Sequence, residues 1–196
     1  WLVAEADESD GSFLRLNPAV AIVTNIDADH LENYGGDFAR VKAAFSEFLH
    51  RLPFYGLAVL CIDDPEVALL AGNTPRHVVT YGFATEADVR AEDVTQQGGR
   101  MQFTLCLPDG SRTPVTLALP GRHNVQNALA AAAVAWQLGV SNDAIARALQ
   151  NFAGIGRRFN QLATLPLAGG GEVVLVDDYG HHPKELAAVF DAARGG

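Results

Sequence analysis

The chain has 196 residues, of which 48% are hydrophobic and 19% charged, and its formal net charge is -9. This size and composition suffice for a sizeable buried core. The acidic balance argues against a basic surface for nucleic acid or anionic lipid, and no apolar run approaches the ~20 residues of a membrane span.

The first half of the chain alternates between strand and helix patterns. Continuous β-branched runs predict strands buried on both faces, and apolar residues at helical spacing or an acid–proline start predict the helices between them. The predicted strands cover 19–27, 56–63 and 77–83, and the predicted helices cover 37–52 and 64–73. This order predicts an α/β fold with a mostly parallel sheet flanked by helices.

The pattern of apolar and polar residues changes after residue 88. Alternating residues over 88–119, with turn signals at 98–99 and 109–110, predict a small antiparallel sheet of about three strands. An alanine-rich helix over 122–139 and a second helix capped by Ser141 follow.

A glycine-rich basic loop, 154–159, then separates these helices from a strand ending in VDDYG and a final helix. We expect a domain boundary in this loop, which would divide the chain into 1–155 and 156–196. The two cysteines, Cys61 and Cys106, lie inside apolar strand-like runs. They are typical of buried thiols in a reducing compartment.

Carboxylates follow two of the predicted strands. Residues 1–4 read as the end of a buried strand before the acidic stretch that contains Glu5, and Asp27, Asp29 and His30 follow the next strand. Ligands of open α/β sheets bind at this carboxyl edge, and oxygen ligands suit Mg²⁺. The alternatives are a solvated acidic turn and, because imidazole prefers softer metals, a hydrogen-bonded loop role for His30.

The stretch GRHNVQN places His123, Asn124 and Asn127 over one helical turn. Asn amides suit an adenine edge and a helix N-terminus favours anions, whereas helix capping is the simpler reading. Arg157 and Arg158 in GIGRRF suit either a phosphate clamp or a basic surface turn. Neither of the two lysines follows a glycine, so the sequence has no P-loop motif, and we expect this chain alone to bind ATP weakly at best.

The stretch VDDYGHHPKE, 176–185, puts two acids, a tyrosine and two adjacent histidines between an apolar run and a helix. A metal site, a proton relay, a substrate clamp and a solvated loop with helix-capping acids all fit these residues.

Six motifs occur in the order and approximate spacing of the Mur ligase family: EADESDGSF, TNIDADHLENYGGDF, LPFYGLAVLCIDD, LPGRHNVQNALAA, GIGRRF and DDYGHHPKE. The chain resembles this family over essentially its whole length, and most closely the alanine-adding branch. The resemblance implies a P-loop ATPase-like core that lacks its P-loop, joined to the first strand and helix of a Rossmann-like amino-acid-binding domain.

The resemblance also implies roles for individual residues, while His182 keeps a structural role. Several sister ligases carry a carbamylated lysine at the position of Phe45, which the alanine-adding branch lacks, so we assign no metal role to Lys42. The matched positions are Glu5 and His30 for Mg²⁺, His123, Asn124 and Asn127 for adenine, Arg158 for the ATP phosphates, Asp178 for the ribose, and Tyr179 and His181 for the incoming alanine.

The activity implied by the resemblance is ATP- and Mg²⁺-dependent ligation of L-alanine to UDP-N-acetylmuramate through an acyl phosphate, in bacterial cytoplasmic peptidoglycan precursor synthesis. Glu5, His30 and Arg158 would be its catalytic residues. The alternatives are another ligase of the superfamily, such as one that recycles murein tripeptide, and a non-catalytic α/β binding module.

Overall fold

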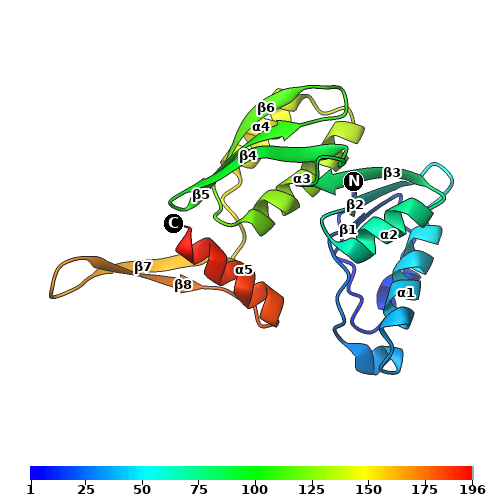
Figure 1. The fold of residues 1–196 in the computed structure, drawn as a ribbon, viewed down its shortest axis with the longest axis horizontal. Coiled ribbons are helices and arrows are strands. Elements are labelled where there is room, and N and C mark those ends of the chain that lie inside the picture. Colours follow the sequence, from blue (N-terminus) through cyan, green and yellow to red (C-terminus); the bar gives the residue numbers. More distant parts are fainter. Residues whose placement is uncertain (196) are drawn as a thin grey trace.

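The computed structural model describes residues 1–195 as a six-stranded sheet with helices on both faces and a separate two-stranded hairpin (Figure 1). The strands are β1 (Val20–Val23), β2 (Leu57–Cys61), β3 (His77–Gly82), β4 (Val89–Gln97), β5 (Arg100–Cys106), β6 (Arg112–Leu117), β7 (Asn160–Pro166) and β8 (Glu172–Asp177). The helices are η1 (Ser12–Arg15), η2 (Leu31–Tyr34), α1 (Phe38–His50), α2 (Pro65–Asn73), α3 (Arg122–Gln137), α4 (Asn142–Asn151) and α5 (Pro183–Arg194).

The large sheet confirms the predicted α/β class. Its strands lie in chain order, β1-β2-β3-β4-β5-β6, with parallel pairs up to β4 and antiparallel pairs beyond it. The predicted three-stranded antiparallel sheet is therefore present, but it continues the parallel sheet. Two residue pairs make the junction, Tyr81 with Val89 and Gly82 with Arg90.

The middle strands carry the core because helices cover both faces of the sheet. Residues of β2 alternate between the two hydrophobic clusters, so Val59 faces the cluster that contains α3 and Leu60 faces the cluster that contains α1. Every residue of β2 is buried, as its continuous apolar run predicts. On α3, Val125 and Leu129 are fully buried, so this helix is fixed to the sheet.

Strand β1 is buried on one face only, so the prediction of burial on both faces was wrong for it. Ala21 and Val23 face the cluster under α1, whereas Ile22 remains 44% exposed. The reason is its edge position: within residues 1–195, β1 pairs with β2 alone, and α3 packs against β2, β3 and β4.

The predicted strand over residues 1–4 is also wrong, because residues 1–8 have no strand or helix structure. The side chains of Trp1, Leu2 and Val3 are more than nine-tenths exposed. An apolar run forms a strand only where it pairs with a neighbouring strand, and residues 1–4 join no ladder of the sheets described over residues 1–195.

Side-chain caps begin three of the helices, α1, α2 and α5. The Asp37 carboxylate accepts the N–H of Ala39 before α1, and Asp64 precedes Pro65 at the start of α2. Ser141 occupies the predicted N-cap position of α4, but its hydroxyl makes no capping hydrogen bond. Gly139 follows α3 in the left-handed conformation that closes it.

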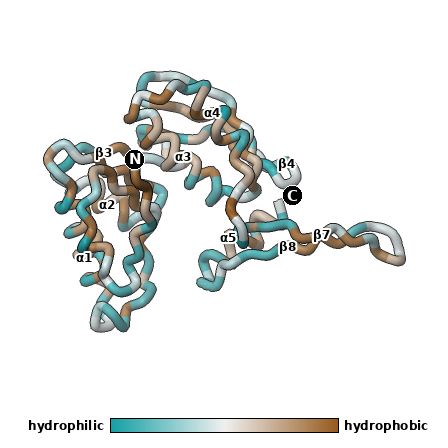
Figure 2. The backbone as a smooth tube through the Cα atoms, turned by 180° about the vertical axis from the view of Figure 1, so that it is seen from behind, coloured by the Kyte–Doolittle hydropathy of each residue, from teal (hydrophilic) through white to brown (hydrophobic). Residues whose placement is uncertain are grey.

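The hairpin of β7 and β8 projects away from the rest of the molecule (Figure 1). Strand β7 lies where we had expected a loop to continue, so sequence reasoning missed it. Hydrophobic residues run along the projecting strands (Figure 2). Leu162, Leu165, Val174 and Leu175 are each at least half exposed, so the hairpin leaves apolar surface uncovered.

Helix α5 is attached to the main body by a bridging amide. Gln96 Nε2 donates to the carbonyl of Ala192 at 2.7 Å, and Gln96 Oε1 accepts the N–H of Gly121 at 3.0 Å. This side chain ties the last turn of α5 to the segment that begins α3. No helix within residues 1–195 is long and apolar enough to cross a membrane.

Candidate functional site

A cleft of about 1060 Å³ lies where the sheet, the first turn of α3 and the start of α5 meet. Of the residues singled out in the sequence, Glu5, His123, Asn124, Asn127, Arg158 and Asp178 line it. His30, Tyr179 and His181 lie outside its lining. The cleft thus brings together residues from four distant segments of the chain.

The two acidic loops contact each other at one wall of the cleft. Asn33 Nδ2 donates to the carbonyl of Ser9 at 2.8 Å, and the Tyr34 hydroxyl donates to the carbonyl of Glu8. Within the first loop, the Asp7 carboxylate accepts the N–H of Ser9 at 2.8 Å. This bond lowers the pKa of Asp7, and nearby His30 lowers it further.

His30 is held among carboxylates rather than in a formed metal site. Its backbone is left-handed, with φ of 51°, and its ring nitrogens lie 3.6 Å from Asp29 Oδ2 and 3.7 Å from Glu32 Oε1. The Glu5 side chain is exposed. Across residues 1–195, no group of three or more His, Cys, Asp or Glu side chains is arranged to hold a metal. Joint metal binding by Glu5 and His30 stays a prediction.

Two side chains at the start of α5 contact the acids that follow β1. The Lys184 ammonium pairs with the Asp27 carboxylate, and His182 Nε2 lies 3.9 Å from Asp29 Oδ2. His182 is also the N-cap of α5, where it forms a capping box with Glu185. The structural role expected for His182 is confirmed, while the contact of Lys184 was missed.

The first turn of α3 presents the polar residues predicted from GRHNVQN. Asn124 Nδ2 donates to the carbonyl of Pro120 at 2.7 Å. Gly121 precedes the helix with φ of 93°, and a Cβ there would lie 2.6 Å from His123 Cε1, so glycine is required for close approach of the ring. Burial lowers the pKa of His123, partly opposed by the Asp178 carboxylate.

Asp178 joins the loop after α4 to the loop after β8. Its Oδ2 accepts the N–H of Phe159 and its Oδ1 accepts the N–H of Gly180, each at 2.7 Å. Phe159 has φ of 48°, a left-handed conformation that is strained for a bulky residue. Arg158 extends from the same loop and lies 3.6 Å from Glu185.

Tyr179 and His181 form an exposed aromatic pair beside this junction. Their ring centroids lie 5.4 Å apart at 73°, and the Arg157 guanidinium lies 4.7 Å from the centre of the Tyr179 ring. Since neither side chain lines the cleft, their role toward an amino acid stays a prediction.

The carboxylate of Asp63, at the end of β2, was missed as a site residue. It accepts the N–H of Phe83 at 2.9 Å and the N–H of Ala84 at 3.1 Å, and Gln126 Nε2 donates to it at 2.7 Å. The sequence CIDDP shows two acids after a strand, but only Asp64 carries a local helix-capping signal.

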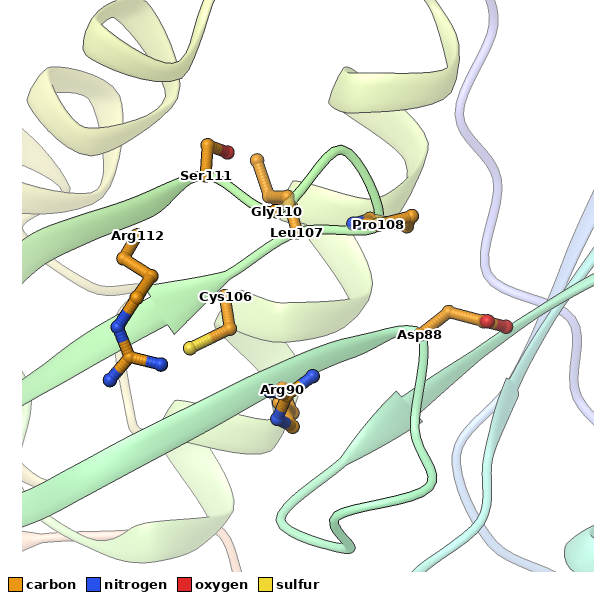
Figure 3. A pocket seen from close by; sticks show the side chains of 8 residues that line it. All are labelled: Asp88, Arg90, Cys106, Leu107, Pro108, Gly110, Ser111 and Arg112. Atoms are coloured by element: carbon orange, nitrogen blue, oxygen red, sulfur yellow. The ribbon is translucent and has the colours of Figure 1, made fainter.

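A second cavity, of about 230 Å³, lies among β4, β5 and β6 and shares no lining residue with the cleft (Figure 3). Arg90 and Arg112 line it and share the Glu92 carboxylate at 3.0 and 2.6 Å. Because this carboxylate offsets part of their charge, we read the cluster as a cross-strand support of the sheet.

Phe45 occupies the helix position where the sister ligases are expected to carry a lysine. Its ring centroid lies 5.4 Å from that of Phe13, so the residue packs in the core under α1. Lys42 lies 3.2 Å from Glu66, which gives this lysine a surface ion pair.

Comparison with known proteins gives one consistent relationship. The Mur ligase middle domain model matches residues 3–135. The UDP-N-acetylmuramate–L-alanine ligase of Xanthomonas campestris pv. campestris is 76% identical over all 196 residues, which span 41% of that protein's length.

Solved structures that resemble this chain are also Mur ligases. The UDP-N-acetylmuramate-alanine ligase of Thermotoga maritima matches with a TM-score of 0.79 and 28% identity, covering 97% of this chain and 41% of that one. MurF of Acinetobacter baumannii matches with a TM-score of 0.79 and 26% identity, covering 95% of this chain and 40% of that one. Family model, sequence relatives and fold all lead to one assignment: the chain belongs to the Mur ligase family.

Proposed function

We propose that this chain is part of an ATP-dependent ligase that joins L-alanine to UDP-N-acetylmuramate in peptidoglycan precursor synthesis in the bacterial cytoplasm. Mur ligases are ATP-dependent amide ligases. The observation that carries the proposal is the cleft, which gathers His123, Asn124 and Asn127 of one helix with Arg158 and Asp178 of the opposite wall. The identity of 76% to the Xanthomonas alanine ligase supports the choice of amino acid.

We also propose the division of the chain into a central ATP-binding domain, 1–155, and the start of an amino-acid-binding domain, 156–196. The separate β7–β8 hairpin supports this boundary, since it shares no ladder with the large sheet. The cleft would then lie between the two parts, so that nucleotide binding requires residues from both.

The chemistry follows from the poor leaving group of a carboxylate. A carboxylate oxygen of the substrate attacks the γ-phosphorus of ATP, the bond to the β-phosphate oxygen breaks, and ADP leaves. The amine of L-alanine then attacks the acyl carbon of the acyl phosphate, phosphate departs with the electron pair, and the amine loses a proton. Positioning and charge neutralisation dominate such phosphoryl transfer.

Individual residues would have separate roles in binding the substrates. The amides of Asn124 and Asn127 would hydrogen-bond the adenine edge beside His123, whose neutral ring is favoured by its lowered pKa. Arg158 would pair with phosphate oxygens, and Asp178 would accept a ribose hydroxyl with lone pairs that its two backbone bonds leave free. Tyr179 and His181 would face the incoming alanine.

Mg²⁺ fits the oxygen donors of the acidic wall, where Glu5, Glu8, Asp27 and Asp29 line the cleft. Magnesium sites commonly use one or two carboxylates plus substrate phosphates, so a larger protein cluster is not required. We propose Glu5 as its ligand together with His30, although imidazole matches this metal less well. Bound Mg²⁺ would supply neutralisation of phosphate charge.

The test uses the complete polypeptide that contains this chain. ADP release should require both UDP-N-acetylmuramate and L-alanine. Asn127→Ala should raise the ATP KM about tenfold, as expected for an unpaired polar partner, while the control Asn151→Ala, at the exposed end of α4, should not. Turnover with murein tripeptide in place of L-alanine would indicate a recycling ligase. Absence of ADP release would indicate a binding module.

A further inference from the structure

We propose that Asp63 and Gln126 are positioning residues that hold the first turn of α3 in the orientation needed for nucleotide binding. The proposal rests on the ATP site proposed above. Neither residue carries a role in the site as described so far. Their hydrogen bond, 2.7 Å from Gln126 Nε2 to Asp63 Oδ2, joins the end of β2 to the helix that bears His123, Asn124 and Asn127.

Asp63 is itself held by the loop that follows β3. The N–H of Phe83 lies 2.9 Å from both carboxylate oxygens, and the N–H of Ala84 lies 3.1 Å from Oδ1. A Cβ on Gly82 would lie 2.5 Å from Oδ1, so only glycine leaves room for this approach. The carboxylate is therefore a fixed acceptor, aimed by backbone groups that cannot rotate away.

The loop after β3 also contacts α3 directly, through Phe83. The Arg122 guanidinium lies 3.9 Å from the centre of the Phe83 ring, and Arg122 is one helical turn before Gln126. The contacts of Arg122 and Gln126, four residues apart, restrict both the rotation of this turn about the helix axis and its shift along that axis. His123, Asn124 and Asn127 project from the same turn into the cleft.

The bond between Gln126 and Asp63 constrains the helix although its setting is exposed. Charge-assisted hydrogen bonds are short and directional, and a misplacement of about 1 Å at a binding residue can reduce a rate a hundredfold. The buried side of α3, at Val125 and Leu129, fixes its distance from the sheet. The bond of Gln126 adds the remaining constraint at the open end of the helix.

A donor–acceptor exchange in the complete polypeptide tests the proposal. Gln126→Glu places a second carboxylate against Asp63 and should raise the ATP KM about tenfold, with kcat within about twofold. Asp63→Asn alone should have a small effect, because the Gln126 amide can turn its oxygen toward the new donor. The double variant should return to near the wild-type KM, since the Asn amide can donate to the introduced carboxylate while its oxygen still accepts from Phe83 and Ala84.

Three outcomes would overturn the proposal. A double variant as impaired as Gln126→Glu would mean that the new charge acts on the nucleotide directly. Loss of kcat in Asp63→Asn would make Asp63 a direct participant. An unchanged ATP KM in Gln126→Glu would show that the bond between Asp63 and Gln126 has no role in nucleotide binding. Amide exchange at Phe83 and Ala84 should rise in Gln126→Glu and recover in the double variant. This readout needs no ATP, so a wild-type protein without ATP-dependent activity would refute the proposed function separately.

Discussion

Replacement of Asp178 by alanine should release two loops at once. The carboxylate accepts the N–H groups of Phe159 and Gly180 at 2.7 Å, short distances typical of charge-assisted bonds. Such bonds contribute about 1.5–3 kcal/mol each when buried. Asp178 is half-buried, so we take the lower end, about 1.5 kcal/mol per amide, which corresponds to about a tenfold change in an opening equilibrium.

Hydrogen exchange by NMR measures this effect at each amide. In Asp178→Ala, exchange at Phe159 and Gly180 should accelerate about tenfold, and the left-handed backbone of Phe159 should relax because the carboxylate no longer holds its N–H. The control is Asp191→Ala, an exposed acid on α5 whose partner is Arg194. Unchanged exchange at both amides would refute the reasoning. Equal acceleration throughout the chain would also refute it, because the effect would then be global. In the complete polypeptide, the same variant should weaken ATP binding.

Three further predictions concern titration and burial. Burial depresses the pKa of His123 below 6.5, so its contribution to stability is present above pH 6.5 and is lost as pH falls through the folded value; an NMR titration midpoint at or above 6.5 would contradict this. Arg112 and Arg90 lower the pKa of Glu92 to about 2, so this contribution is present above pH 4.5 and is lost as pH falls through about 2; carboxyl NMR should show that midpoint, and one near 4.5 would exclude the ion pairs. The Tyr81 hydroxyl is fully buried without a hydrogen-bond partner in residues 1–195, so Tyr81→Phe should leave the free energy of unfolding unchanged or raise it by about 1 kcal/mol in urea denaturation. A loss of more than about 1 kcal/mol would show that the hydroxyl is paired in solution.

Features set by neighbouring residues could be predicted from the sequence. The acid–proline start of α2, the glycine that closes α3 and the three strands of the antiparallel region all depend on local signals. The polar turn at the start of α3 was found for the same reason, since three site residues lie within five positions of each other.

Features that depend on distant partners could not be predicted. Asp63 and Gln126 are 63 residues apart, and Asp27 and Lys184 are 157 apart, so no local pattern links them. The expected strand over residues 1–4 failed because strand formation requires a neighbouring ladder. Strand β7 was missed because the glycines and arginines before it gave a loop signal that hid its start.

The projecting β7–β8 hairpin can be covered within one molecule or can pair with another molecule, and these two processes compete during synthesis. It presents apolar side chains and, as a two-stranded sheet, two open edges. Covering of the hairpin within one molecule is a first-order process. Pairing with the hairpin of another copy is second-order, so its rate rises with protein concentration. We therefore expect dilution to favour the monomer and overexpression to favour aggregates that form through this hairpin.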